Sequence, residues 1–278
     1  MRSLTLFGVR IDDVTEDELE ARLLDMCTTK NAQSRLVVTP NPEFLLEARK
    51  NETYRSLLNS SALSLPDGVA LRFAAAALLD VHNLHRHPGV DVLPLIAMLA
   101  QRTEITLVLL GGTDLSLPRT EQYFATLTEG INIISINPGI INETDSRLGT
   151  GIVAQLQKIG PCVIAVALGQ GKGRRQGKQE RVAAFIEQEV PNAHLIIGVG
   201  GAFDSIAGVT DRGPVFLRRL GFEWLWRAAR EPWRAKRIFR ATIVFPITVA
   251  YDTLRHGRLS RALCAVWQEL RLHFFPRS

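Results

Sequence analysis

The 278 residues are 46% hydrophobic and 22% charged, with a net charge of +5. These values predict a folded globular protein, built as one large domain or as one domain with an appendage, and exclude a disordered chain. No run reaches the ~20 consecutive apolar residues that a membrane-spanning helix needs, and the acidic residues from Asp12 to Glu18 are not expected in a signal peptide. Cys27, Cys162 and Cys264 lie far apart without a C-x-x-C spacing, which favours a reducing cytoplasm over a disulfide framework or zinc site.

Short apolar runs alternate with amphipathic segments along most of the chain. Strands are expected at 4–11, 35–39, 63–65, 105–110, 131–136, 162–168 and 195–199, with a turn at 200–204. Helices are expected after the capping box Thr15-x-x-Glu18, from Phe44, after Asn51, and at 69–79, 91–100, 117–127, 147–158 and 178–189. Because the strands are apolar throughout, they indicate a parallel sheet covered on both faces. The sequence therefore predicts an α/β fold over residues 1–210, with a Rossmann-like, mostly parallel sheet and helices on both faces.

The C-terminal part of the chain differs in charge and pattern. Residues 212–278 hold fourteen Lys and Arg against four Asp and Glu, whereas the rest of the chain is mildly acidic. Only helices are expected there, so residues 211–278 are predicted to form an all-helical basic appendage. This charge asymmetry suggests an anionic partner for the segment: a membrane surface, a diphosphate or nucleic acid. A basic face is commonly just solvated, but the excess of basic residues and the interleaved Trp224, Trp226 and Trp233 favour an interfacial surface. Pro246 interrupts the late apolar stretch, which is therefore interpreted as an interfacial helix.

Several polar residues fall where predicted strands end or the following helices begin. The candidates are Thr39, Asn41, Asp67, Arg86, Asp91, Gln179 and Glu180. Each has an ordinary structural explanation, and Asp67, in Pro66-Asp67-Gly68, could simply cap the next helix. The carboxyl ends of parallel strands meet at one edge, where open α/β sheets bind ligands. The set therefore predicts a ligand site at that edge.

Familiar phosphate and metal motifs are missing from the sequence. The Gly- and Lys-rich loop from Gly169 to Gln179 fits neither G-x-G-x-x-G nor G-x-x-x-x-G-K-[ST], and no D-x-D pair occurs. His82, His85 and His87 could bind a metal, but a solvated polar loop is the favoured interpretation. The negative charge of a bound diphosphate would then have to be neutralised by Arg and Lys side chains.

An ordered set of motifs brings a known family into view. The motifs are Thr39-Pro-Asn41-Pro-Glu-Phe44, Leu65-Pro-Asp67-Gly68, Arg86-x-x-Gly89-x-Asp91, Lys178-Gln179-Glu180, Gly198-Val-Gly-Gly-Ala-Phe-Asp204-x-x-Ala-Gly208, and Arg219-Leu-Gly-x-Glu223-Trp224-Leu-x-Arg227 followed by Glu231-Pro232-x-Arg234-x-x-Arg237. From Phe7 to about Arg240, the chain resembles the WecG/TagA/CpsF family of bacterial glycosyltransferases. It departs from the family pattern in the longer loop between Gly169 and Lys178, and in Gly177 where the family has proline.

The resemblance implies an inverting, metal-independent transferase that needs no cofactor. Such enzymes move N-acetylmannosamine or a related sugar from a UDP-sugar to a polyprenyl-diphosphate-linked acceptor, as peripheral proteins on the inner face of the cell membrane. Asp67 matches the family's candidate general base. Thr39, Asn41, Arg86 and Gln179 match positions at the nucleotide-sugar pocket, and Asp91 and Glu180 belong to the same motifs. The C-terminal Arg227, Arg234 and Arg237 match an appendage that closes over the site and holds it at the membrane.

Two other function classes stay open at this point, together with the oligomeric state. A parallel sheet alone would suit a nicotinamide-dependent oxidoreductase, although the missing G-x-G-x-x-G counts against it. The basic C-terminus would suit a nucleic-acid-binding protein, although the body is acidic and no recognition motif is present. Aromatic appendage helices could also be buried between the subunits of a homo-oligomer.

Overall fold

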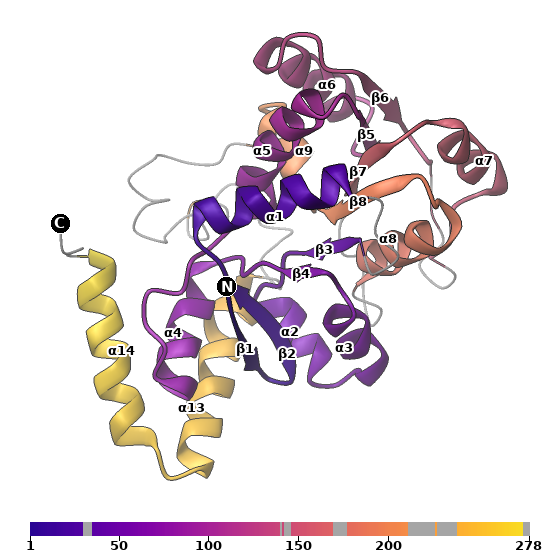
Figure 1. Ribbon diagram of the computed structural model, residues 1–278. Helices are drawn as coiled ribbons and strands as arrows, with labels where there is room; N and C mark the ends of the chain where they lie inside the picture. Colours follow the sequence, from indigo (N-terminus) through magenta and orange to yellow (C-terminus); the bar gives the residue numbers. More distant parts are fainter. Residues whose placement is uncertain are drawn as a thin grey trace.

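A parallel sheet forms the centre of the computed structural model, which describes residues 1–29, 35–139, 141, 146–168, 177–210, 226 and 238–274. The sheet has six strands in the order β4-β3-β8-β7-β5-β6, and every pair is parallel (Figure 1). The strands are β3 (Leu36–Val38), β4 (Leu63–Ser64), β5 (Thr106–Gly111), β6 (Ile133–Ile136), β7 (Cys162–Ala167) and β8 (Ala193–Gly198). The predicted parallel α/β sheet is confirmed.

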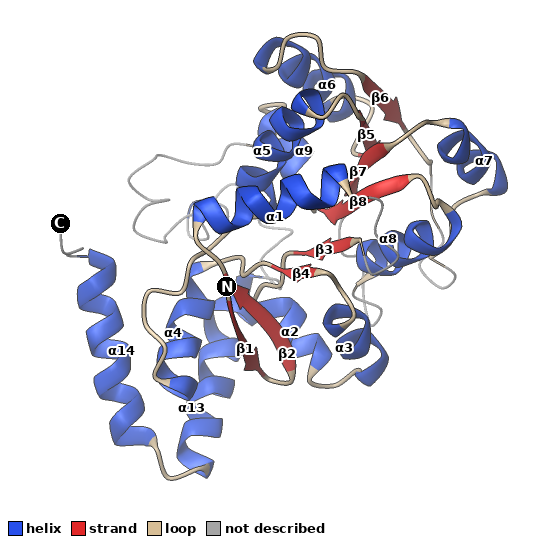
Figure 2. Ribbon diagram, viewed as in Figure 1, coloured by secondary structure: helices blue, strands red, loops and turns tan. Residues whose placement is uncertain are grey.

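Helices cover both faces of this sheet (Figure 2). They are α1 (Glu16–Thr28), α2 (Pro42–Ala48), α3 (Glu52–Asn59), α4 (Val69–Leu79), α5 (Gly89–Arg102), α6 (Ser116–Leu127), α7 (Thr150–Lys158), α8 (Lys178–Glu189) and α9 (Ala202–Ile206). Within a strand, alternate residues enter opposite cores: Val163 packs with residues of α1 and α5, and Ile164 packs with residues of α2 and α8. Both side chains are fully buried, which explains why the strands are apolar throughout.

The N-terminal segment differs from the prediction of one strand over 4–11. It forms an antiparallel hairpin of β1 (Arg2–Leu6) and β2 (Val9–Asp13), separate from the central sheet. Phe7 and Gly8 connect the strands with φ of 51° and 80°, the two left-handed conformations that a two-residue type I′ turn requires. Further along, α9 begins at Ala202 inside the segment predicted to be a turn.

The described C-terminal residues are helical, as predicted, and pack against the N-terminal half of the chain. They form a π-helical turn η2 (Arg240–Val244), then α13 (Phe245–Arg255) and α14 (Leu259–Phe274). The Phe245 ring is buried edge-on against Phe7, with the ring centroids 5.7 Å apart. Arg49 binds Asp252 through two hydrogen bonds of 2.6 and 2.8 Å. Figure 1 shows α14 beside α4.

The division of the chain at residue 211 stays a prediction, because residues 211–225 and 227–237 lie outside the described part. In the part that is described, none of the helices has the length and apolar character needed to cross a bilayer.

Candidate active site

Asp67 lies where the chain leaves the carboxyl end of β4. The segment after β4 continues beside the segment after β3: the Leu65 amide donates to the Val38 carbonyl, and the Asp67 amide to the Pro40 carbonyl, both at 2.8 Å. Asp67 therefore lies next to the segment that carries Thr39 and Asn41. The N-cap residue of α4 is Gly68, with φ of 93°, and not Asp67. The glycine allows the sharp turn, because this conformation is costly for residues with a Cβ atom.

The loop before α5 brings Arg86 to the same edge. The His87 amide donates to the Pro66 carbonyl at 3.0 Å, so Arg86 is one residue from a direct contact with the Asp67 segment. Arg86 is half-buried. Gly89 lies against the end of β8, where a Cβ atom would lie 3.2 Å from the Cα atom of Val199.

Gln179 joins the ends of β7 and β8. Its side chain is only 1% exposed. Its Oε1 atom accepts from the Gly200 amide at 2.9 Å and from the Leu168 amide at 3.3 Å, and its Nε2 atom donates to Glu180 Oε1 at 3.1 Å. A Cβ atom at Gly198 would lie 2.6 Å from Gln179 Nε2, so the glycine provides space for this amide.

Thr39 reaches the same place from β3, because its hydroxyl donates to the Gly198 carbonyl at 3.3 Å. Asn41, two residues later, is the N-cap of α2, and its side-chain oxygen accepts from the amides of Glu43 and Phe44 at 3.0 and 3.3 Å. These contacts fix the direction in which the chain leaves β3.

Glu180 is buried beside a tyrosine that the sequence analysis did not single out. The Tyr54 hydroxyl, from α3, donates to Glu180 Oε2 at 3.3 Å. Burial and then the charge of Glu180 raise the pKa of Tyr54 well above its ordinary value, so the phenol keeps its proton. Gly177, with φ of 85°, passes so close that a Cβ atom would lie 2.3 Å from the Tyr54 ring. In the sequence, Tyr54 fits the pattern of a buried helix face, as any core residue would, so nothing there points to its contact with Glu180.

The contacts therefore gather the segments that carry six of the predicted site residues: Thr39, Asn41, Asp67, Arg86, Gln179 and Glu180. Asp91 is exposed in the first turn of α5, at an open cleft of about 370 Å³ that Tyr123 and Ser205 also line. The predicted arginines Arg227, Arg234 and Arg237 lie outside the described residues.

The three histidines of the polar loop contact different partners. His82 lies 3.2 Å from Asp80 and 3.3 Å from Glu269, whereas His85 lies 2.8 Å from Asp13. His87 is buried against the Val14 carbonyl, whereas Asn83 and His85 are exposed, so part of the loop is solvated and part is enclosed. Burial raises the pKa of Asp13, but hydrogen bonds from His85 and Arg2 outweigh it, and the net pKa lies below its ordinary value. Among the residues described, no three His, Cys, Asp or Glu are grouped to hold a metal ion.

A parallel α/β sheet with polar side chains gathered at its carboxyl edge defines the class of open α/β proteins that bind a ligand in the crevice at that edge. Residues 4–259 match the model of the Glycosyl transferase WecG/TagA/CpsF family. The chain belongs to this family and is a glycosyltransferase. This membership sets aside the oxidoreductase and nucleic-acid-binding alternatives.

Two curated relatives are N-acetylglucosaminyldiphosphoundecaprenol N-acetyl-beta-D-mannosaminyltransferases. The protein of Bacillus subtilis (strain 168) is 27% identical over 203 residues, which cover 73% of this chain and 74% of the relative. The protein of Staphylococcus aureus (strain MW2) is 24% identical over 247 residues, which cover 88% of this chain and 91% of the relative.

Proposed function

We propose that this enzyme transfers N-acetylmannosamine, or a closely related sugar, from a UDP-sugar to a polyprenyl-diphosphate-linked N-acetylglucosamine acceptor. The reaction proceeds with inversion and without a metal ion. The observation that carries the proposal is the position of Asp67 at the carboxyl edge, between the segments of Thr39 and Arg86. The names of the two relatives supply the acceptor and the transferred sugar.

In this mechanism Asp67 is the general base. Its carboxylate takes the proton of the acceptor hydroxyl while that oxygen attacks the anomeric carbon of the donor sugar. The bond from the anomeric carbon to UDP breaks, and its electron pair leaves with the diphosphate oxygen. A single displacement of this kind inverts the anomeric centre. General-base assistance is worth roughly 10²–10⁴-fold in rate.

Cationic side chains stabilise the charge that develops on the leaving diphosphate. Within the part of the chain that the structure describes, Arg86 is the candidate for this role, because the contact of His87 with Pro66 holds its loop beside Asp67. Arg227, Arg234 and Arg237 are proposed to add to this charge from the appendage. Thr39, Asn41 and Asp91 are proposed to contact the substrates. Gln179 acts by holding Leu168 and Gly200 in place, and Glu180 by its contact with the Gln179 amide.

The test is release of UDP from a panel of UDP-sugars, with a short-chain polyprenyl-diphosphate N-acetylglucosamine acceptor and excess EDTA. The account expects acceptor-dependent release with UDP-N-acetylmannosamine, undiminished by EDTA. Release that requires an added divalent ion would contradict the metal-free mechanism. Failure of folded protein to release UDP from any of the donors would contradict the substrate assignment.

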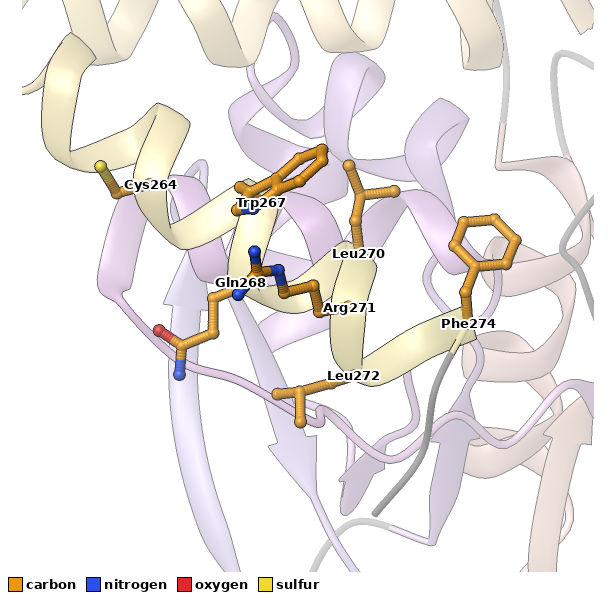
Figure 3. Close-up of a pocket in the computed structure, with 7 residues that line it drawn as sticks. All are labelled: Cys264, Trp267, Gln268, Leu270, Arg271, Leu272 and Phe274. Carbon is orange, nitrogen blue, oxygen red and sulfur yellow. The ribbon is translucent and has the colours of Figure 1, made fainter.

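A second element of the proposal places the enzyme on the inner face of the cell membrane through its C-terminal helices. Large apolar side chains on these helices face solvent, three or four residues apart around α13 and four or seven residues apart on α14. They are Phe239, Ile243, Ile247, Tyr251 and Leu254 around α13, and Leu259, Leu263, Trp267 and Phe274 on α14. Arginines accompany them, and the guanidinium carbon of Arg271 lies over the Trp267 ring, 5.4 Å from the ring centroid (Figure 3). Apolar and aromatic residues flanked by arginine are typical of helices that lie in the surface of an anionic membrane.

Vesicle binding tests this placement. The variant Leu263→Ser/Trp267→Ser is expected to lose sedimentation with anionic liposomes at low salt, because two large side chains leave the contact surface. Leu127→Ser is the matched control, since Leu127 is also an exposed apolar residue but lies on α6. Equal sedimentation of both variants, or a homodimer that buries Trp267 in place of vesicle binding, would refute the membrane assignment.

A further inference from the structure

Glu269 of α14 is a fully buried carboxylate, with 0% of its side chain exposed. Its Oε1 atom accepts a hydrogen bond from Arg72 Nε at 2.7 Å and lies 2.5 Å from Arg72 Nη2 in the same ion pair. Its Oε2 atom accepts from the Asn83 amide at 3.1 Å and lies 3.3 Å from His82 Nδ1. Both oxygens are thus engaged, which is what a carboxylate buried in protein requires.

The partners of Glu269 lie on the two segments that carry the proposed catalytic groups. Arg72 is in the first turns of α4, five residues after Asp67. Asn83 is in the loop before α5, three residues before Arg86, and Arg72 Nη2 also donates to Asn83 Oδ1 at 3.0 Å. The contact of the His87 amide with Pro66 joins the same two segments at the site itself. One carboxylate therefore contacts both of the segments that carry Asp67 and Arg86.

The helix that supplies this carboxylate begins at Leu259, the residue at which the family match ends. We propose that Glu269 is a positioning residue of this active site, which holds α4 and the loop before α5 so that Asp67 and Arg86 keep their relative placement. The exposed side of α14 carries Leu263 and Trp267, so one helix provides both the surface-facing residues and the buried Glu269 that contacts α4 and the loop before α5. The catalytic part of this inference rests on the proposed function; the structural part does not.

The experiment compares Glu269→Ala and Glu269→Gln with Asp252→Ala in the full chain. Asp252 is the matched control because its pair with Arg49 also anchors the C-terminal helices, but to the end of α2 and not to the segments of Asp67 or Arg86. Two readouts are taken well below the melting temperature of each variant. One is kcat and KM with the soluble short-chain acceptor, which needs no membrane. The other is hydrogen exchange at the amides of Asp67 and His87, which needs no activity.

We expect Glu269→Ala to lower kcat by ~10–100-fold with little change in KM, since small displacements of reacting groups have costs of this size. Exchange at the Asp67 and His87 amides should accelerate by about tenfold, and Glu269→Gln, which keeps an acceptor oxygen, should lie between wild type and Glu269→Ala. Asp252→Ala should lower only the melting temperature. Unchanged exchange at these amides in Glu269→Ala, or the same kcat loss in Asp252→Ala, would overturn the positioning role. An inactive wild type with accelerated exchange in Glu269→Ala would instead overturn the proposed function. It would still support the structural claim that Glu269 holds α4 and the loop before α5 in place.

Discussion

Replacing Gln179 by methionine tests whether its amide holds the ends of β7 and β8 together. Methionine keeps the length and approximate volume of the side chain but removes its hydrogen-bonding groups. The amides of Leu168 and Gly200 then lose their acceptor, and Glu180 loses a donor. Leu168 and Gly200 are both half-buried, so water recovers part of the hydrogen-bond energy that each amide loses. At about 1–2 kcal/mol for each unpaired amide, Gln179→Met should destabilise the protein by about 2–4 kcal/mol.

Urea unfolding followed by circular dichroism measures this difference. Gln188→Met is the matched control, because Gln188 is exposed near the other end of α8 and the same substitution there should change stability by less than about 0.5 kcal/mol. The same preparation should show a reduced kcat, since Gly200 lies at the carboxyl edge where the substrates are proposed to bind. A Gln179→Met protein as stable as the Gln188→Met control would refute the bracing role of the amide.

Three further predictions concern a glycine, an ion pair and the cysteines. Gly177→Ala should cost about 2–4 kcal/mol of unfolding free energy, because alanine disfavours the left-handed φ and its Cβ atom would overlap the Tyr54 ring; a neutral effect in thermal unfolding would contradict the packing. The hydrogen bond from Arg49 lowers the pKa of Asp252 below its ordinary 3.8. The ionised form therefore stabilises the fold above that value, and the stability difference from Asp252→Asn should disappear as the pH falls through the lower folded-state pKa, whereas a pH-independent difference would argue against the ion pair. Burial raises the pKa of Cys27 and Cys162 to about 12, whereas Cys264 is exposed; a thiol reagent at about pH 8 should label one cysteine of the native protein, and fast labelling of two would contradict the burial.

The sequence predicts elements best where local chemistry and hydrophobic pattern agree. The helices at Val69–Leu79 and Lys178–Glu189 have the predicted bounds, because a glycine with positive φ starts each one and an apolar face defines its length. The N-terminal hairpin was predicted as one strand, since Phe7 occupies a turn position where asparagine or aspartate is the usual signal.

The candidate site was predictable only to the extent that topology determines it. Parallel strands end at a common edge, so residues such as Thr39 and Asp67 could be expected to meet there. The contacts that hold this edge depend on partners far away in the chain. Tyr54 and Glu180 are 126 residues apart, and Arg72 and Glu269 are 197 residues apart. No local pattern encodes such a pair, and Glu269 looks in the sequence like an ordinary charged residue of a surface helix.

The most direct test of the catalytic account is the kcat of Asp67→Asn. The substitution keeps the shape of the side chain and removes the base, while the backbone contact of residue 67 with Pro40 can persist. With UDP-N-acetylmannosamine and the short-chain acceptor, the account predicts a loss of ~10²–10⁴-fold in kcat, with KM for the donor and the melting temperature little changed. A folded Asp67→Asn enzyme whose kcat lies within about threefold of wild type, far short of the contribution of a general base, would contradict the assignment of Asp67 as the base.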